Sequence, residues 1–155
     1  MHIQPESFKS KLLKLGFNFY PTVRASGAWL TYISSDIRHV KLKLPLKLKT
    51  RNYVGTLCGG NMYAAVDGVY VVMLIKVLGR GYIVWDKSAS IRYKKPARET
   101  LYAEFHLTEQ ELDTIEQTVA EKGKVDRDYL VELKTAAGEV CAEITKTIHV
   151  KQKGV

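Results

Sequence analysis

The chain has 155 residues, a length that suits a single domain over residues 1–155. Its core can be large enough to fold without disulfide bonds or a structural metal ion. Its 24 basic and 16 acidic residues give a net charge of +8, which favours a polyanionic partner. The two cysteines, Cys58 and Cys141, show no CxxC or Cys/His ligand spacing, so we expect no disulfide framework, no metal site and a reducing, cytoplasmic setting.

The N-terminal part predicts two short helices followed by a strand. Residues 7–15 carry apolar side chains at helical spacing and are followed by Gly16, and a second short helix is predicted over 21–29. From Val40 to Lys47, apolar residues alternate with lysines, and this period of two predicts a strand with one face in water.

The stretch from Leu57 to Leu78 is apolar almost throughout and is closed by Gly79. At 22 residues it is too long for an ordinary strand, so we expect a buried helix over about 57–79. Because this stretch contains Asn61, Asp67 and several glycines, and the N-terminus does not resemble a secretion signal, we expect no membrane span.

The second half of the chain predicts four strands and one helix. Segments 82–93 and 100–107 favour strands, and Pro96 between them indicates the connection of a hairpin. Thr108 and Glu111 form a capping box for an amphipathic helix over about 108–122. Alternating segments 129–135 and 139–150 predict a second hairpin. The sequence therefore predicts an α+β domain whose antiparallel sheet wraps around the long helix.

Asp67 is the charged residue in the middle of this apolar helix. A buried carboxylate is normally hydrogen-bonded, paired or placed in a functional cleft, since burying it alone costs several kcal/mol. Two interpretations stay open: a structural carboxylate at an oligomer interface or backbone cap, and a base or nucleophile in a pocket.

Three glycines, Gly55, Gly59 and Gly60, precede or begin the same helix. The first-turn N–H groups of a helix lack intrahelical partners and can hold an anion or the oxygen of a polarised carbonyl, although these glycines can equally serve close packing. Gly60 and Asp67 are roughly 10 Å apart along one helix at 1.5 Å per residue. If they share a function, the spacing favours a symmetric oligomer with antiparallel helices and two composite sites.

The run from Asn52 to Asp67 resembles the pattern of hot-dog acyl-CoA thioesterases of the phenylacetate-degradation type. That pattern has an Asn, a Gly, a His-Gly-Gly turn, a Gln or Asn, and an Asp seven residues after the second Gly. Nearly the whole chain also resembles a bacterial family of thioesterase-like hot-dog proteins of unassigned function, with typical segments at 51–56, 82–87 and 95–98.

The resemblance implies a role for each matching residue. The Gly60 N–H would polarise a thioester carbonyl, Asp67 would be the base or nucleophile, Asn61 would position water or substrate, and Asn52 would brace the turn. Cys58 stands where the pattern has His, and a thiol cannot donate and accept as imidazole does. Gly59 of the turn is also expected to contact the substrate, and Met62, Tyr63 and Val66 are expected to line an acyl tunnel. Basic residues are expected to bind the coenzyme A phosphates: Arg51, Arg92, Lys94, Lys95 and Arg98.

The resemblance implies an acyl-CoA thioesterase that acts as a homodimer or dimer of dimers, with coenzyme A as part of the substrate and no separate cofactor. A non-catalytic acyl-CoA or fatty-acyl binding protein is the alternative. Nucleic acid binding has only the basic charge in its favour, because no ribonucleoprotein motif, KH loop or zinc finger is visible. A hydratase would be expected to use a His near the helix, and none occurs between His39 and His106.

Overall fold

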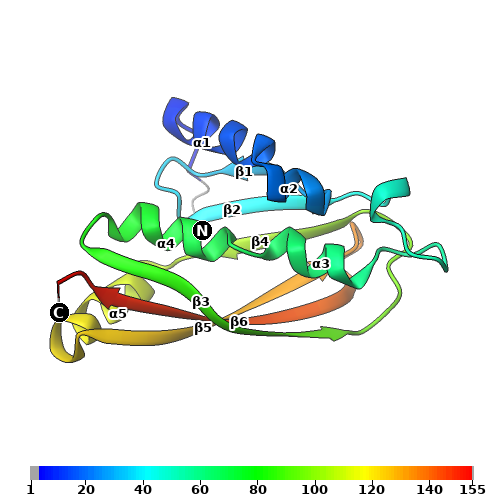
Figure 1. The fold of residues 1–155 in the computed structure, drawn as a ribbon. Coiled ribbons are helices and arrows are strands. Elements are labelled where there is room, and N and C mark those ends of the chain that lie inside the picture. The colour runs from blue at the N-terminus through cyan, green and yellow to red at the C-terminus, as the bar shows by residue number, and fades with distance from the viewer. Residues whose placement is uncertain (1–3, 155) are drawn as a thin grey trace.

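The computed structural model describes residues 4–154, which form six strands and five α-helices. Figure 1 shows a curved sheet with two helices end to end along one face and two more beside its first strands. The elements are α1 (Phe8–Phe19), α2 (Pro21–Ser26), β1 (Trp29–Ile33), β2 (His39–Leu44), a 3-10 turn (Leu48–Thr50), α3 (Gly59–Val66), α4 (Val69–Leu78), β3 (Tyr82–Tyr93), β4 (Leu101–His106), α5 (Glu109–Lys122), β5 (Lys124–Lys134) and β6 (Val140–Gln152). The α+β prediction is confirmed.

The sheet is antiparallel and has the order β1-β2-β4-β5-β6-β3. Inward-facing side chains alternate with exposed ones, as along β4, where Leu101, Ala103 and Phe105 are buried while Tyr102 and Glu104 are exposed. The inner face packs against α3 and α4, so the core lies between sheet and helices.

The hairpin predicted from segments 82–93 and 100–107 is wrong, although both segments are strands. β3 pairs along its length with β6 at one edge of the sheet, while β4 lies between β2 and β5. Local sequence predicted the strands but not their partners, because pairing depends on segments far apart in the chain. The second predicted hairpin, β5 with β6, is confirmed.

The long apolar segment forms two helices where one was expected. α3 begins at Gly59, and Asp67 leaves the helix with extended backbone (φ −63°, ψ 135°). Gly68 follows in the left-handed region (φ 76°), and α4 then starts at Val69. The break occurs at a glycine because left-handed backbone costs an L-residue with a side chain about 1 kcal/mol.

By length and composition, Gly59–Leu78 would also suffice to cross a membrane, with a mean hydropathy of 1.5. In the fold this segment lies along the sheet, and Met62, Val66, Met73 and Leu74 are buried in the shared core. This is the position of a core helix, and the core helix of a soluble protein can be as long and as apolar as a membrane span.

The N-terminal helices and β1 differ from the sequence prediction in their bounds. α1 continues past Gly16 because Phe17 packs on the core and Asn18 is buried against β1. The Asn18 amide donates to the Leu30 carbonyl (3.0 Å) and accepts from the Leu30 N–H (2.7 Å). The helix predicted over 21–29 ends at Ser26, and β1, which the sequence analysis missed, begins at Trp29.

Candidate functional site

The loop before α3 is held by the side chain of Asn52. Its amide donates to the Thr56 hydroxyl (2.8 Å) and its carbonyl accepts from the N–H groups of Thr56 (3.0 Å) and Val54 (3.2 Å). Gly55 lies inside this loop with φ 82°. The Cys58 N–H donates to the Thr50 carbonyl (2.8 Å), so the N-terminus of α3 is anchored at a defined place.

Gly59 and Gly60 open α3 and have different surroundings. A Cβ on Gly59 would lie 2.5 Å from the Tyr93 hydroxyl, so this glycine lets the tyrosine ring approach the helix. A Cβ on Gly60 would meet nothing within 4 Å, and Gly60 is exposed. The Gly60 N–H belongs to the first helical turn, whose donors lack intrahelical partners.

A hollow of about 390 Å³ lies beside this helix start. It brings together five residues that the sequence analysis selected: Asn52, Gly59, Met62, Lys94 and Lys95. The remaining basic candidates lie elsewhere: Arg92 lines a separate hollow on β3, and Arg51 and Arg98 are exposed outside both. Lys94 and Lys95 each approach a carboxylate, of Glu143 (3.4 Å) and Glu139 respectively.

Asp67 lies at the other end of α3, and its predicted burial is wrong for the single chain. Its side chain is 48% exposed because the helix ends there. The Tyr63 hydroxyl donates to Asp67 Oδ1 (3.3 Å), and the ammonium of Lys146 donates to the same oxygen. Asp67 is thus fixed by two donors while keeping one side open to solvent.

Lys146 is the residue of this site that the sequence analysis missed. Its side chain is 2% exposed, and besides Asp67 its Nζ lies 2.9 Å from Asp86 Oδ1 and 5.3 Å from the centre of the Tyr63 ring. Burial alone would lower the pKa of Lys146, but the two carboxylates outweigh it and raise the pKa above its ordinary value. The lysine therefore remains charged beneath Asp67.

A signal for Lys146 was present in the sequence. β6 buries Ala142, Ile144, Ile148 and Val150 in one alternating row, and Lys146 occupies a position in that row. Asp86 pairs with this buried lysine, while its chain neighbour Lys87 pairs with Asp126 (2.5 Å).

An apolar hollow of about 380 Å³ adjoins Asp67. Its lining comes from α1, α2 and the start of α4, and consists of Gly16, Phe17, Tyr20, Thr22, Val23, Asp67, Gly68 and Val72. The tunnel residues expected from the resemblance lie differently. Met62 and Val66 are buried in the core (3% and 1% exposed), and Tyr63 is half-buried with its hydroxyl on Asp67.

The two ends of α3 are not brought together within one chain. Gly60 lies in the first turn and Asp67 follows the last, as the helical spacing predicted. Asn61 is engaged locally, because its amide donates to the Ser26 carbonyl (2.8 Å) and ties α2 to α3. A site that uses both Gly60 and Asp67 needs a second copy of the chain.

A family model described as a domain of unknown function, DUF4442, matches residues 9–150. The chain belongs to the DUF4442 family. No curated protein matches it. The expected resemblance to a family of unassigned function is confirmed.

Solved structures show which fold this DUF4442 chain shares. A Pseudomonas aeruginosa protein named a probable thioesterase superposes with a TM-score of 0.82 at 18% identity, covering 97% of this chain and 99% of its own. A Haemophilus influenzae thioesterase gives 0.69 at 14% identity, covering 99% and 98%. A hypothetical thioesterase from Streptococcus pneumoniae, solved with coenzyme A, gives 0.57 at 17% identity, covering 82% and 91%. The DUF4442 chain therefore has the hot-dog fold of thioesterase-like proteins.

Proposed function

We propose that this protein is an acyl-CoA thioesterase that hydrolyses its substrate by attack of a water molecule activated by Asp67. The observation that carries the proposal is the setting of Asp67. Its carboxylate is fixed by Tyr63 and Lys146, is half-exposed, and borders an apolar hollow of about 380 Å³. A general base needs a fixed carboxylate that water can reach, and an acyl chain needs an apolar space beside it.

In the proposed reaction, Asp67 takes a proton from water as the oxygen attacks the thioester carbonyl. The carbonyl oxygen becomes an oxyanion, which the Gly60 N–H in the first turn of α3 stabilises. The tetrahedral intermediate then collapses, the C–S bond breaks, and the coenzyme A thiolate leaves and takes up a proton. Cys58 has no role in these steps, since no His is placed beside it in the motif to activate the thiol.

The proposal places the active site between two copies of the chain. β3 is an edge strand of 12 residues whose outer side pairs with no other strand of residues 4–154, and its central residues Ser88, Ala89 and Ser90 are exposed. Long unpaired edges pair readily with another strand. A two-fold axis at this edge would set two α3 helices antiparallel and bring Gly60 of one copy toward Asp67 of the other, in a homodimer or a dimer of dimers.

Lys94 and Lys95 beside the start of α3 are the best placed basic residues for the coenzyme A phosphates. The coenzyme A in the related Streptococcus pneumoniae structure supports this ligand class. Because intracellular acyl thioesters would be the substrates, we also propose a cytoplasmic location.

The direct test is Asp67→Asn, assayed with a panel of acyl-CoA thioesters of different chain length. Loss of a general base lowers turnover by about 10²–10⁴-fold, so we expect D67N to lose nearly all activity while remaining folded. Asp113→Asn, an exposed carboxylate on α5, is the matched control and should retain full turnover. Undiminished hydrolysis by D67N would remove Asp67 from the mechanism.

A non-catalytic acyl-CoA binding protein is the second candidate, and Cys58 in place of the motif His is the observation that favours it. Such a protein would be stabilised by acyl-CoA without consuming it. A rise in melting temperature with intact acyl-CoA recovered afterwards would select this candidate over hydrolysis.

A further inference from the structure

We propose that His39, Glu104 and His106 form a binding site for one divalent transition-metal ion of the zinc type, on the face of the sheet opposite α3 and α4. The proposal is independent of the hydrolytic activity, because these residues lie on β2 and β4, away from Asp67 and Gly60.

The ligand atoms converge because of the strand register. His39 on β2 lies directly opposite His106 on β4, and Glu104 is two residues before His106, on the same face. Glu104 Oε2 lies 3.0 Å from His39 Nε2 and 3.3 Å from His106 Nε2. The two imidazole rings stack at 4.0 Å, and the three ligand atoms all lie within 4.8 Å of one another.

The chemistry of these groups fits a metal. Zinc is commonly bound by two imidazoles and one carboxylate, with a remaining position open to water or substrate. His39 is 7% exposed, so the surrounding fold holds its imidazole in place beside Glu104 and His106. An imidazole protonated on Nδ1 leaves its Nε2 lone pair free for the ion.

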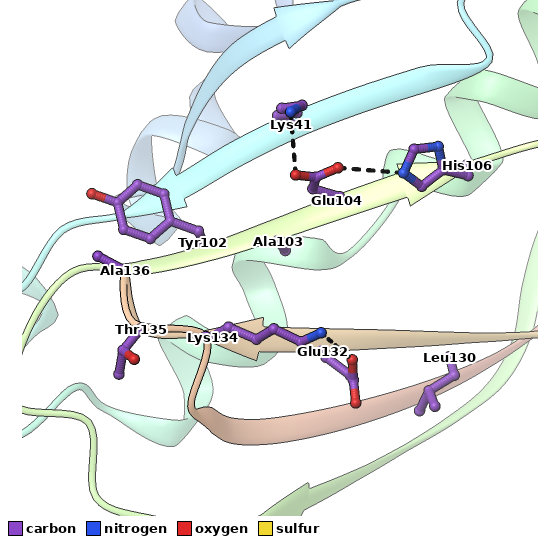
Figure 2. A pocket seen from close by; sticks show the side chains of 11 residues that line it. Lys41, Tyr102, Ala103, Glu104, His106, Leu130, Glu132, Lys134, Thr135 and Ala136 are labelled. Carbon is purple, nitrogen blue, oxygen red and sulfur yellow. Dashed lines mark hydrogen bonds and ion pairs between the residues drawn. The ribbon is translucent and has the colours of Figure 1, made fainter. Parts of the chain in front are cut away.

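Lys41 orients the carboxylate. Its ammonium lies 3.2 Å from Glu104 Oε1, and this leaves Oε2 directed at the imidazoles, as Figure 2 shows for His106. An outer partner that fixes a ligating carboxylate in this way is a regular feature of metal sites.

The ion would face a pocket of about 720 Å³ lined by Glu104 and His106. The pocket exists because the ladder between β4 and β5 is limited to the pair of Tyr102 and Lys134, so the outward side chains of the two strands stand apart (Figure 2). Lys41 and Lys134 also line it, but each is paired with a glutamate of the same pocket, Glu104 (3.2 Å) and Glu132 (2.6 Å), so the open position suits a water molecule.

The cross-strand origin of the ligands explains why the sequence analysis expected no metal. His39 and His106 are separated by β3 and both central helices in the chain, and Glu-x-His alone is no recognised ligand spacing. The two histidines become neighbours only through the antiparallel register of β2 and β4.

The test is calorimetric titration of the purified full chain with Zn²⁺, together with its melting temperature in Zn²⁺ and in chelator. We expect one ion per chain and a higher melting temperature with metal. Glu104→Gln and His106→Gln, both at partly exposed positions that the fold tolerates, should each weaken Zn²⁺ binding at least about tenfold. His39→Gln should do the same, with circular dichroism as the check that this buried position still folds.

His149→Gln is the matched control. His149 also contacts a carboxylate, Asp126 (2.5 Å), but with a single imidazole, so its loss should leave Zn²⁺ binding unchanged. The proposal is overturned if the wild-type chain binds no more Zn²⁺ than H106Q and E104Q do. Equal weakening by H149Q would show non-specific uptake by surface histidines and would overturn it as well.

Discussion

Lys146 is a fully buried cation in an otherwise apolar row of β6, and its two carboxylate partners make that position tolerable. Removing one partner of a buried ion pair leaves the other charge uncompensated, which usually costs more than the pair contributed. Asp86 is the partner most dependent on the lysine, because its Oδ1 is buried and lies 2.9 Å from the Lys146 ammonium that neutralises it. The lysine therefore supports both the fold and the position of Asp67.

We expect Lys146→Met to lower the free energy of unfolding by about 2–3 kcal/mol, below the full cost of breaking a buried pair because Asp67 is half-exposed. Urea unfolding measures this difference. Lys124→Met, at an exposed position on the same sheet, should change the free energy by less than about 0.5 kcal/mol. A K146M protein as stable as the wild type would show that the ion pairs contribute nothing.

The pH dependence of this difference has a definite sign. The pKa of Lys146 is raised in the folded state above its ordinary 10.5, so its contribution is complete below pH 10.5 and is lost as the pH rises through the folded-state pKa. We expect the stability difference between wild type and K146M to be the same at about pH 7 and pH 9 and to shrink only in more alkaline solution. A difference that declines between pH 7 and 9 would contradict the raised pKa.

At the scale of the elements, the break between α3 and α4 places Asp67 where water can reach it. The break depends on Gly68, whose φ of 76° only glycine adopts at low cost, whereas Gly60 has ordinary helical backbone and open space around it. Gly60 and Gly68 thus have separable functions: Gly68 has a conformational one, and Gly60 has one in the proposed oxyanion site.

Alanine substitutions separate these functions. Gly68→Ala should lower the free energy of unfolding by about 1–2 kcal/mol, since the left-handed backbone strains any L-residue with a Cβ. Gly60→Ala should leave stability within about 0.5 kcal/mol yet reduce kcat/KM, because its methyl group occupies the space into which the carbonyl must come. Unfolding and acyl-CoA turnover measured on both variants check the pair. If G60A were fully active, the oxyanion role of Gly60 would be wrong.

At the scale of the whole molecule, the two residues of the proposed catalytic pair, Gly60 and Asp67, lie at opposite ends of α3 in a single chain. A dimer would join them, and this can be tested by mixing inactive variants. Asp67→Asn and Gly60→Val each disable both composite sites of a homodimer. A mixed dimer contains one site with an intact Asp67 from one chain and an intact Gly60 from the other.

We therefore expect a one-to-one mixture of D67N and G60V, unfolded and refolded together, to recover about a quarter of wild-type activity, since half of the dimers are mixed and each has one of two sites intact. Each variant refolded alone is the control. Light scattering confirms that dimers form. A mixture as inactive as its components would show that the active site lies within one chain.

Local sequence determined those elements whose periodicity and caps act over a few residues. Thr108 and Gly123 bound α5, the strands predicted at 129–135 and 139–150 lie in the C-terminal hairpin of β5 and β6, and the apolar run predicted as a helix over about 57–79 forms the helical layer. These follow from the sequence because capping, helical spacing and strand alternation are properties of neighbouring residues. The Asn52 to Asp67 pattern likewise pointed to the loop and helix that carry the candidate site.

Only the tertiary structure decided which distant segments meet. It placed β3 on β6 at the sheet edge, joined Lys146 to Asp67 across 79 residues, and set His39 opposite His106. The break at Asp67 and Gly68 also emerged only in the fold, where α4 packs separately on the sheet. The physical reason is that a strand's alternation fixes which side chains face the core, while its partner is chosen by packing over the whole sheet.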